Sequence, residues 1–150
     1  MLQDSKPIAN PRLESISYAP AAGDSNAKLD EEGKPLNAGT YTATMTVCDG
    51  ETLLGTVTAN VKVEKAVVSA ATLDNASLTF DGQEKTPAVT SITANGKTHN
   101  APALGTDYTV TYANNTNAGE ATATVTGQGN FMGSVPVDFT IEPNTGAPNV

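Results

Sequence analysis

The residues best suited to binding a ligand lie in one acidic loop in the first part of the chain. Asp24, Asn26, Asp30, Glu31 and Glu32 carry side-chain oxygens at short spacing, and oxygen is the ligand atom that calcium prefers. The spacing does not match a recognised calcium-binding loop, however, and clustered acidic residues usually form a solvated surface. We therefore expect a solvated loop here, with a calcium site as the alternative, and no cofactor.

The chain has one histidine and one cysteine. His99 lies in a polar stretch, residues 95–100, and there is no second histidine to form a metal site with it. Cys48 has no partner for an intrachain disulfide, so we expect a small, half-buried thiol near a strand end. Gly127-Gln128-Gly129 follows a strand but opens no helix, which indicates a turn and not a nucleotide-binding loop. Because no nucleophile is matched with a base, we expect no catalysis.

Two tyrosines are candidates for carbohydrate recognition. Tyr108 and Tyr112 share one face of an expected strand with Val110 and alternate with threonines. An aromatic surface can bind a sugar ring, but this alternation is typical of side chains that face a core. The chain contains no tryptophan, which weakens the sugar-binding interpretation further. We expect core packing.

The acidic composition argues against several classes of partner. The chain has 150 residues, a net charge of −8 and a pI near 4.4. Nucleic acids and anionic membrane surfaces both attract basic proteins. No apolar run approaches the roughly 18–20 residues of a transmembrane helix, and residues 1–7 lack the apolar core of a signal peptide. We expect no nucleic acid partner and no membrane insertion in this segment.

A repeat organises the elements that hold these residues. Residues 37–47 align with residues 117–126 through a shared Asn-Ala-Gly and alternating threonines, and residues 55–64 align with residues 133–142. A tandem repeat of a small β module indicates an array, and arrays mostly position other parts of a protein. The hydrophobic content of 38% is below the usual ~45–50%, which fits modules with small cores.

Apolar residues that alternate with polar ones between turn signals predict short strands. We expect strands at residues 13–18, 41–47, 56–63, 67–73, 78–80, 89–92, 108–112, 121–125 and 135–141. Asn95-Gly96 predicts a two-residue hairpin, because both positions tolerate positive φ. Pro136 lacks an N–H, so the last strand is expected to begin at a sheet edge or to carry a bulge. No helix is expected, since Gly33 and Pro35 interrupt residues 29–36.

The predicted fold class is all-β, with two tandem small antiparallel β-sandwich modules arranged end to end. The first module, residues 1–65, is shorter than the second, residues 66–143, and residues 144–150 form a linker. The junction at residues 64–66 contains no glycine or proline, which restricts the orientation of the modules. The repeat and the abrupt ends favour a segment excised from a longer protein over a cytosolic protein.

The second module resembles repeats found in large bacterial cell-surface proteins. Those repeats contain an aromatic-x-Gly strand end, a Thr-Pro and the sequence Gly-Thr-Asp-Tyr-Thr-Val-Thr-Tyr. They continue with an Asn-Asn turn, an Asn-Ala-Gly, a Gly-x-Gly-Asn-aromatic-x-Gly turn and a final Phe-x-Ile strand. The matching segments are residues 80–82, 86–87, 105–112, 114–115, 117–119, 127–133 and 139–141. Phe80 and Phe131 stand where tyrosine is common, and the first module keeps only the Asn-Ala-Gly and the last strand.

The resemblance implies an Ig-like or related all-β repeat of a secreted, wall-anchored, adhesin-type protein, located outside the cell at the bacterial surface. We expect a non-catalytic spacer that presents an adhesive domain, with other modules of the same polypeptide as its partners. The alternative is a module that binds a host or environmental glycan or protein through its loops. The candidate ligand-facing loop residues are Asp49, Glu51, Lys97, His99 and Asn100. A weaker alternative is a non-catalytic part of a carbohydrate-active enzyme.

Related surface modules sometimes carry a Lys–Asn isopeptide crosslink beside a carboxylate. Lys62, Lys65 and Lys85 are the available lysines near the expected strands. The spacing identifies no particular trio, so the crosslink stays an open alternative.

Overall fold

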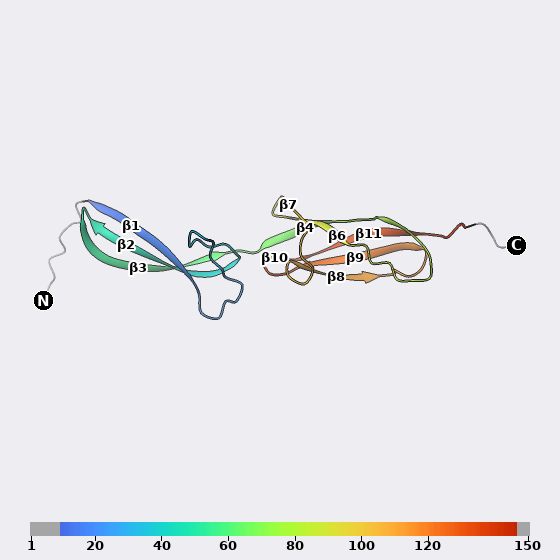
Figure 1. The fold of residues 1–150 in the computed structure, drawn as a ribbon, viewed down its shortest axis with the longest axis horizontal. Helices are drawn as coiled ribbons and strands as arrows, with labels where there is room; N and C mark the ends of the chain where they lie inside the picture. Colours follow the sequence, from blue (N-terminus) through green and yellow to red (C-terminus); the bar gives the residue numbers. More distant parts are fainter. Residues whose placement is uncertain (1–9, 147–150) are drawn as a thin grey trace. The chain divides into compact units, whose positions relative to one another are not determined.

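The computed structural model describes residues 10–146, and this part of the chain consists of strands and turns without a helix (Figure 1). The predicted all-β class is therefore confirmed. The chain divides between Glu64 and Lys65 into two compact units, which we call unit 1 and unit 2. Part of the predicted linker, residues 147–150, lies outside the described residues.

Unit 1 contains one antiparallel sheet. Its strands are β1 (Pro11–Pro20), β2 (Gly39–Asp49) and β3 (Thr52–Val63), with β2 in the centre of the three-stranded order β1-β2-β3. All three strands were expected from their alternation. The expected sandwich is not found among the described residues of unit 1, because they form no second sheet to face this one.

The strand register of unit 1 places its apolar and its polar side chains on opposite faces of the sheet. Residues opposite one another on antiparallel strands share a face, and alternate residues of one strand lie on the same face. The apolar face of unit 1 is formed by Leu13, Ile16, Tyr18 and Pro20 of β1, Tyr41, Ala43, Met45 and Val47 of β2, and Gly55, Val57, Ala59 and Val61 of β3. The other face carries mainly serine, threonine and asparagine. Such a division normally means that the apolar side is covered.

The loop from residue 21 to residue 38 covers one end of this apolar face. The Tyr41 hydroxyl accepts a hydrogen bond from the Lys28 N–H at 3.0 Å and lies 2.6 Å from the Asn37 carbonyl oxygen. Gly39 leaves room for Ala27, whose Cβ would lie 2.8 Å from a Cβ placed on Gly39. Tyr41 is consequently fully buried although unit 1 has a single sheet.

Unit 2 contains two four-stranded sheets. The first, in the order β10-β4-β6-β7, is built from β4 (Ala66–Leu73), β6 (Val89–Ala94), β7 (Lys97–Asn100) and β10 (Phe131–Met132). The second, in the order β5-β11-β9-β8, is built from β5 (Ser77–Thr79), β8 (Tyr108–Ala113), β9 (Gly119–Gly127) and β11 (Ser134–Glu142). Every strand predicted for this half of the sequence is present.

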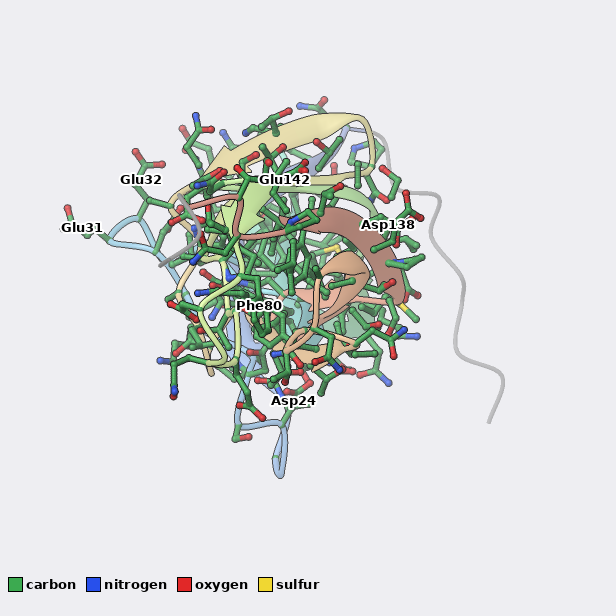
Figure 2. All side chains as sticks on the ribbon, turned by 90° about the vertical axis from the view of Figure 1, so that its right-hand side faces the viewer. Asp24, Glu31, Glu32, Phe80, Asp138 and Glu142 are labelled. Atoms are coloured by element: carbon green, nitrogen blue, oxygen red, sulfur yellow. The ribbon has the colours of Figure 1, made fainter. Side chains whose placement is uncertain are left out.

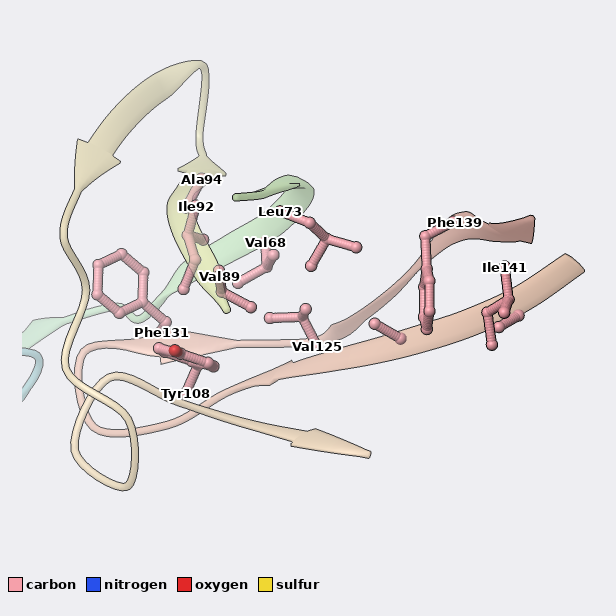
Figure 3. Packing of buried hydrophobic residues seen from close by; sticks show 12 residues of the cluster. Val68, Leu73, Val89, Ile92, Ala94, Tyr108, Val125, Phe131, Phe139 and Ile141 are labelled. Carbon is pink, nitrogen blue, oxygen red and sulfur yellow. The ribbon is translucent and has the colours of Figure 1, made fainter. Parts of the chain in front are cut away.

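The two sheets of unit 2 enclose one hydrophobic core. Figure 3 shows Val68, Leu73 and Ile92 of the first sheet and Val125, Phe139 and Ile141 of the second, all members of the same buried cluster. Ala121 and Ala123 on β9 are also fully buried. Their small side chains allow the facing sheet to approach closely, as their position on the inward face of β9 predicts.

The sheets of unit 2 are mixed, which corrects the expectation of purely antiparallel pairing. β5 runs parallel to β11, and β10 runs parallel to β4. In both cases the chain passes from one sheet to the other through a very short connection, residues 74–76 or Gly133 alone. So short a link leaves no room for the chain to turn back, and the strand continues in the same direction beside a new neighbour. Strand order of this kind is invisible in a periodicity pattern.

Two local predictions in unit 2 are confirmed. Asn95 and Gly96 have φ angles of 48° and 76° and join β6 to β7 with Ala94 opposite Lys97, as the two-residue hairpin requires. β5 pairs with β11 only from Thr140 to Glu142. At Pro136, β11 therefore has β9 on one side and no described strand on the other. The missing N–H of Pro136 thus costs no hydrogen bond between strands.

The repeat extends to the level of paired residues. Tyr41 opposite Val61 in unit 1 corresponds to Ala121 opposite Phe139 in unit 2. The flanking strands β1 and β8 also correspond, since Tyr18 lies opposite Ala43 as Tyr112 lies opposite Ala123. The sheet β1-β2-β3 is thus the counterpart of β8-β9-β11.

Replacing Ile141 with alanine tests the core of unit 2. Ile141 is fully buried, whereas Val67 on β4 is exposed. We expect Ile141→Ala to lower the free energy of unfolding of unit 2 by about 2–5 kcal/mol, because it leaves a cavity, and the control Val67→Ala to change it by less than about 1 kcal/mol. Urea unfolding followed by tyrosine fluorescence measures both. Equal losses in the two variants would contradict the packing described here.

Candidate functional site

A hollow on the described surface lies at one end of unit 2. It has a volume of about 610 Å³ and is lined by Phe80, Asp81, Ala118, Pro143, Asn144 and Gly146. Backbone pairing brings these residues together, because the Phe80 N–H donates to the Glu142 carbonyl at 2.8 Å. Figure 2 shows Phe80 and Glu142 in a view onto this side of the molecule. Phe80 is half-buried and also packs against the core.

The segment beside the hollow is held by a set of hydrogen bonds. The Lys85 ammonium lies 2.6 Å from the Asp81 carboxylate, and the Asp81 carboxylate also accepts the Gln83 N–H at 2.9 Å. The Lys85 N–H donates to the Asn115 carbonyl at 2.7 Å, and the Asn115 amide donates back to the Lys85 carbonyl at 3.0 Å. The Tyr112 hydroxyl donates to the Pro87 carbonyl at 2.7 Å. These contacts hold the segment that follows Asp81, and Asp81 itself lines the hollow.

The electrostatics of the hollow follow from one ion pair. The Lys85 hydrogen bond, and then the Gln83 N–H, hold the pKa of Asp81 below its ordinary value of 3.8. Asp81 is therefore ionised at neutral pH, and its charge is matched by Lys85. What remains at the hollow is an aromatic ring, a proline ring and the Asn144 amide. This set can contact an uncharged polar molecule, but it contains no nucleophile with a base.

The sequence did not identify this hollow. The sequence predicts a strand end at residues 80–82, the end of the module at residue 143 and a linker from residue 144. The hollow depends on the pairing of β5 with β11, two strands that lie far apart in the sequence. An aromatic residue before a turn, taken with a proline after the last strand, was the available signal.

Two of the predicted ligand-facing residues lie in unit 1. Asp49 is the last residue of β2, and its carboxylate accepts the Asn10 N–H at 2.9 Å. Glu51 lies in the turn between β2 and β3 and is exposed. Asp49 thus supports the hairpin end structurally, and Glu51 alone extends into solvent.

The other three lie in unit 2, on a strand and not on the expected loop. Lys97, His99 and Asn100 belong to β7, which pairs with β6 and forms the edge of its sheet. The His99 ring is half-buried and meets the Phe131 ring edge to face, with centroids 4.9 Å apart. The pattern was misread as a loop because the residues of β7 are polar, whereas the Asn95-Gly96 turn pairs them with β6.

The acidic loop of unit 1 uses its carboxylates to hold its own backbone. Asp24 accepts the N–H groups of Asn26 and Ala27, each at 3.2 Å, and that of Thr40 at 2.8 Å. Asp30 accepts the N–H groups of Glu32 at 2.9 Å and Lys34 at 2.8 Å. Figure 2 shows Glu31 and Glu32 extending outward. Within residues 10–146, no three His, Cys, Asp or Glu side chains gather closely enough to hold a metal ion.

The remaining candidate residues have structural roles. Tyr108 is buried and Tyr112 packs against the same core, which confirms the core interpretation, and burial raises the pKa of both phenols. Cys48 is a free thiol and is buried more deeply than the half-buried position expected. Lys62 pairs with Glu64 at 3.0 Å, as Lys85 does with Asp81.

Comparison with known proteins gives no assignment. No protein-family model matches the sequence, and no curated protein matches it. None of the described residues forms a helix long and apolar enough to cross a membrane.

The Asp81–Lys85 pair makes the stability of unit 2 depend on pH. Since the pKa of Asp81 is lowered in the folded state, the pair stabilises the fold fully above the ordinary pKa of 3.8 and loses this effect as the pH falls below that value. We expect the difference in unfolding temperature between the wild type and Asp81→Asn to be largest near neutral pH and to shrink towards pH ~2. Calorimetry between these limits measures it. A difference that stays constant across the range would contradict the ion pair.

Proposed function

We propose that this chain is a non-catalytic spacer segment of a secreted bacterial cell-surface protein, in which tandem β modules follow one another end to end. In this proposal unit 2 is an Ig-like repeat, and unit 1 is a part of the same kind of repeat. The partners are other modules of one polypeptide, and the location is extracellular. The sequence pattern of residues 67–143 and the short junction at residues 64–66 support these points.

The observation that carries the proposal is the repeat at the level of paired residues. Sheet β1-β2-β3 and the strands β8, β9 and β11 share strand order and cross-strand partners. Repetition of one structural unit extends a polypeptide without adding chemistry. Proteins that serve as spacers are built in this way.

The chemistry of the interior agrees with a structural role. No charged or polar residue among residues 10–146 is buried, and no buried side-chain nitrogen or oxygen in that range lacks a hydrogen-bond partner. Active sites usually depart from this rule, because they hold perturbed titratable groups in concave sites.

Small-angle X-ray scattering with extrapolation to zero concentration tests the spacer proposal. A compact chain of this length has a radius of gyration of roughly 15 Å. Two modules end to end, with strands of about ten residues at ~3.3 Å per residue plus loops, should give ~20–25 Å. We expect the larger value, unchanged by added calcium because Asp24 and Asp30 already hold backbone N–H groups. A value near 15 Å would overturn the proposal.

A binding function is the second candidate, and the hollow at Phe80 favours it. An aromatic ring beside an amide and a paired carboxylate offers stacking and hydrogen bonding to an uncharged glycan or to a peptide backbone. This surface differs from the ligand-facing residues expected from sequence, which lie on β7 and at the β2–β3 turn.

A glycan array probed with the wild type and with Phe80→Ala tests the binding candidate. We expect specific signals that fall at least about tenfold in Phe80→Ala, since stacking on an aromatic ring supplies much of the affinity. Leu104→Ala is the matched control, because Leu104 is an exposed apolar residue of unit 2 that does not line the hollow. Absence of signal, or equal loss in both variants, would eliminate this candidate.

A further inference from the structure

The turn between β6 and β7 contains a pair of residues that can react with each other. Asn95-Gly96 is the only place in the chain where a glycine follows an asparagine, and both residues are exposed. The main-chain nitrogen that follows an asparagine can attack the carboxamide carbon and close an imide ring. Glycine favours this attack because it has no Cβ to obstruct the nitrogen. The space around Gly96 is also open, since a Cβ placed there would meet no atom beyond its chain neighbours within 4 Å.

The carboxamide of Asn95 is held with its oxygen against a hydrogen-bond donor. Asn95 Oδ1 accepts the Val67 N–H at 3.1 Å, and the Asn95 N–H donates to the Val67 carbonyl at 3.2 Å. A donor at this distance stabilises the negative charge that develops on a carbonyl oxygen when a nucleophile attacks its carbon. The Val67 N–H therefore acts on Asn95 as an oxyanion hole acts on the substrate of an acyl-transfer enzyme.

The two nitrogens that would react are not engaged elsewhere. Within residues 10–146, no hydrogen bond uses the Gly96 N–H or Asn95 Nδ2. The Gly96 nitrogen can therefore lose its proton to a base in the solvent, and the ammonia formed from Nδ2 can leave into water.

Other residues of the chain lack one of these features. Asn75 is exposed, and its Oδ1 accepts the Ser77 N–H at 3.0 Å, but an alanine follows it. Asp49 and Asp81 each precede a glycine, but a carboxylate is a weaker electrophile than a carboxamide because its charge repels an anionic nucleophile. Only Asn95 combines the following glycine with a carboxamide whose oxygen accepts a hydrogen bond.

We propose that Asn95 is a site of spontaneous modification, at which the chain converts the asparagine into aspartate or isoaspartate with water as the co-reactant. This inference does not depend on the spacer function. In the first step the deprotonated Gly96 nitrogen forms a bond to Cγ of Asn95. The bond from Cγ to Nδ2 breaks, and ammonia leaves with a proton taken from water.

Water opens the imide in the second step. Attack at Cγ restores the main-chain amide and leaves an aspartate side chain. Attack at the main-chain carbonyl carbon leaves the chain running through Cγ, which is isoaspartate. Each opening consumes one water molecule, and neither step oxidises or reduces any group.

Both products change one end of the first sheet of unit 2. Each adds one negative charge to the −8 of the chain. Isoaspartate also adds a methylene to the main chain, so Ala94 and Lys97, which pair across the turn, lose the geometry of a two-residue hairpin. The next strand, β7, places the His99 ring against Phe131, and we expect this contact to weaken with the pairing.

Peptide mapping of the full chain after incubation in mildly alkaline buffer tests the proposal. Trypsin cuts after Lys85 and Lys97, and the peptide of residues 86–97 has Asn95 as its only amide side chain. We expect this peptide to exchange the mass of NH₂ for that of OH, and to take up a heavy oxygen atom from labelled water, ahead of the peptide that contains Asn75. Asn95→Gly keeps a turn sequence that hairpins accept and should abolish the change. Conversion of the Asn75 peptide as early as that of residues 86–97 would overturn the proposal.

Two variants of Val67 test the role of its N–H. Val67→Pro removes the donor to Asn95 Oδ1, and Ala66 before it already lies in a strand, as a residue before proline prefers. Val67→Ala is the matched control, because it keeps the N–H at the same exposed position. We expect residues 86–97 to convert severalfold more slowly in Val67→Pro than in Val67→Ala. Equal or faster conversion in a folded Val67→Pro, with the fold checked by circular dichroism, would overturn the role of Val67. The mapping of the wild type decides the site whether or not this variant folds.

Discussion

The pairing of β9 with β11 is the constraint on which unit 2 depends. Ala121 and Ala123 lie opposite Phe139 and Val137, so a small residue faces a large one at each step and the facing sheet can pack closely. β8 extends the sheet on one side and β5 on the other. The buried members of the core, from Val68 on β4 to Ile141 on β11, then fill the space between the two sheets.

The corresponding pair of strands in unit 1, β2 and β3, carries its large residue on the other strand. Its large residue, Tyr41, lies on the central strand opposite Val61, whereas in unit 2 the large residue, Phe139, lies on β11. Tyr41 carries a hydroxyl, and this group binds the backbone at Lys28 and Asn37. The loop of residues 21–38 can therefore cover this end of the sheet by hydrogen bonding, although it contains no strand pattern long enough to form a second sheet. The uncovered remainder of the sheet leaves Leu13, Ile16 and Val57 exposed.

Much of the fold could be predicted because alternation and turn chemistry are local. The strand from Val135 to Ile141, the hairpin at Asn95-Gly96 and the edge position of Pro136 were all expected, since each depends on a few neighbouring residues. β7 was missed because its polar side chains at an exposed sheet edge resemble a loop. The parallel pairing of β5 with β11 was missed because the sequence does not reveal which sheet a short strand joins. The hollow at Phe80 depends on that pairing and was missed with it.

The sequence by itself determined the all-β class, the strands and the repeat, because these follow from periodicity and from glycine, proline and asparagine at turns. Only the tertiary structure decided which strands share a sheet, that unit 1 has one sheet where unit 2 has two, and which apolar residues are covered. Leu13 and Val57 alternate with polar residues as the core residue Val125 does, but burial depends on what packs above a face. That is a property of distant segments, and no local pattern encodes it.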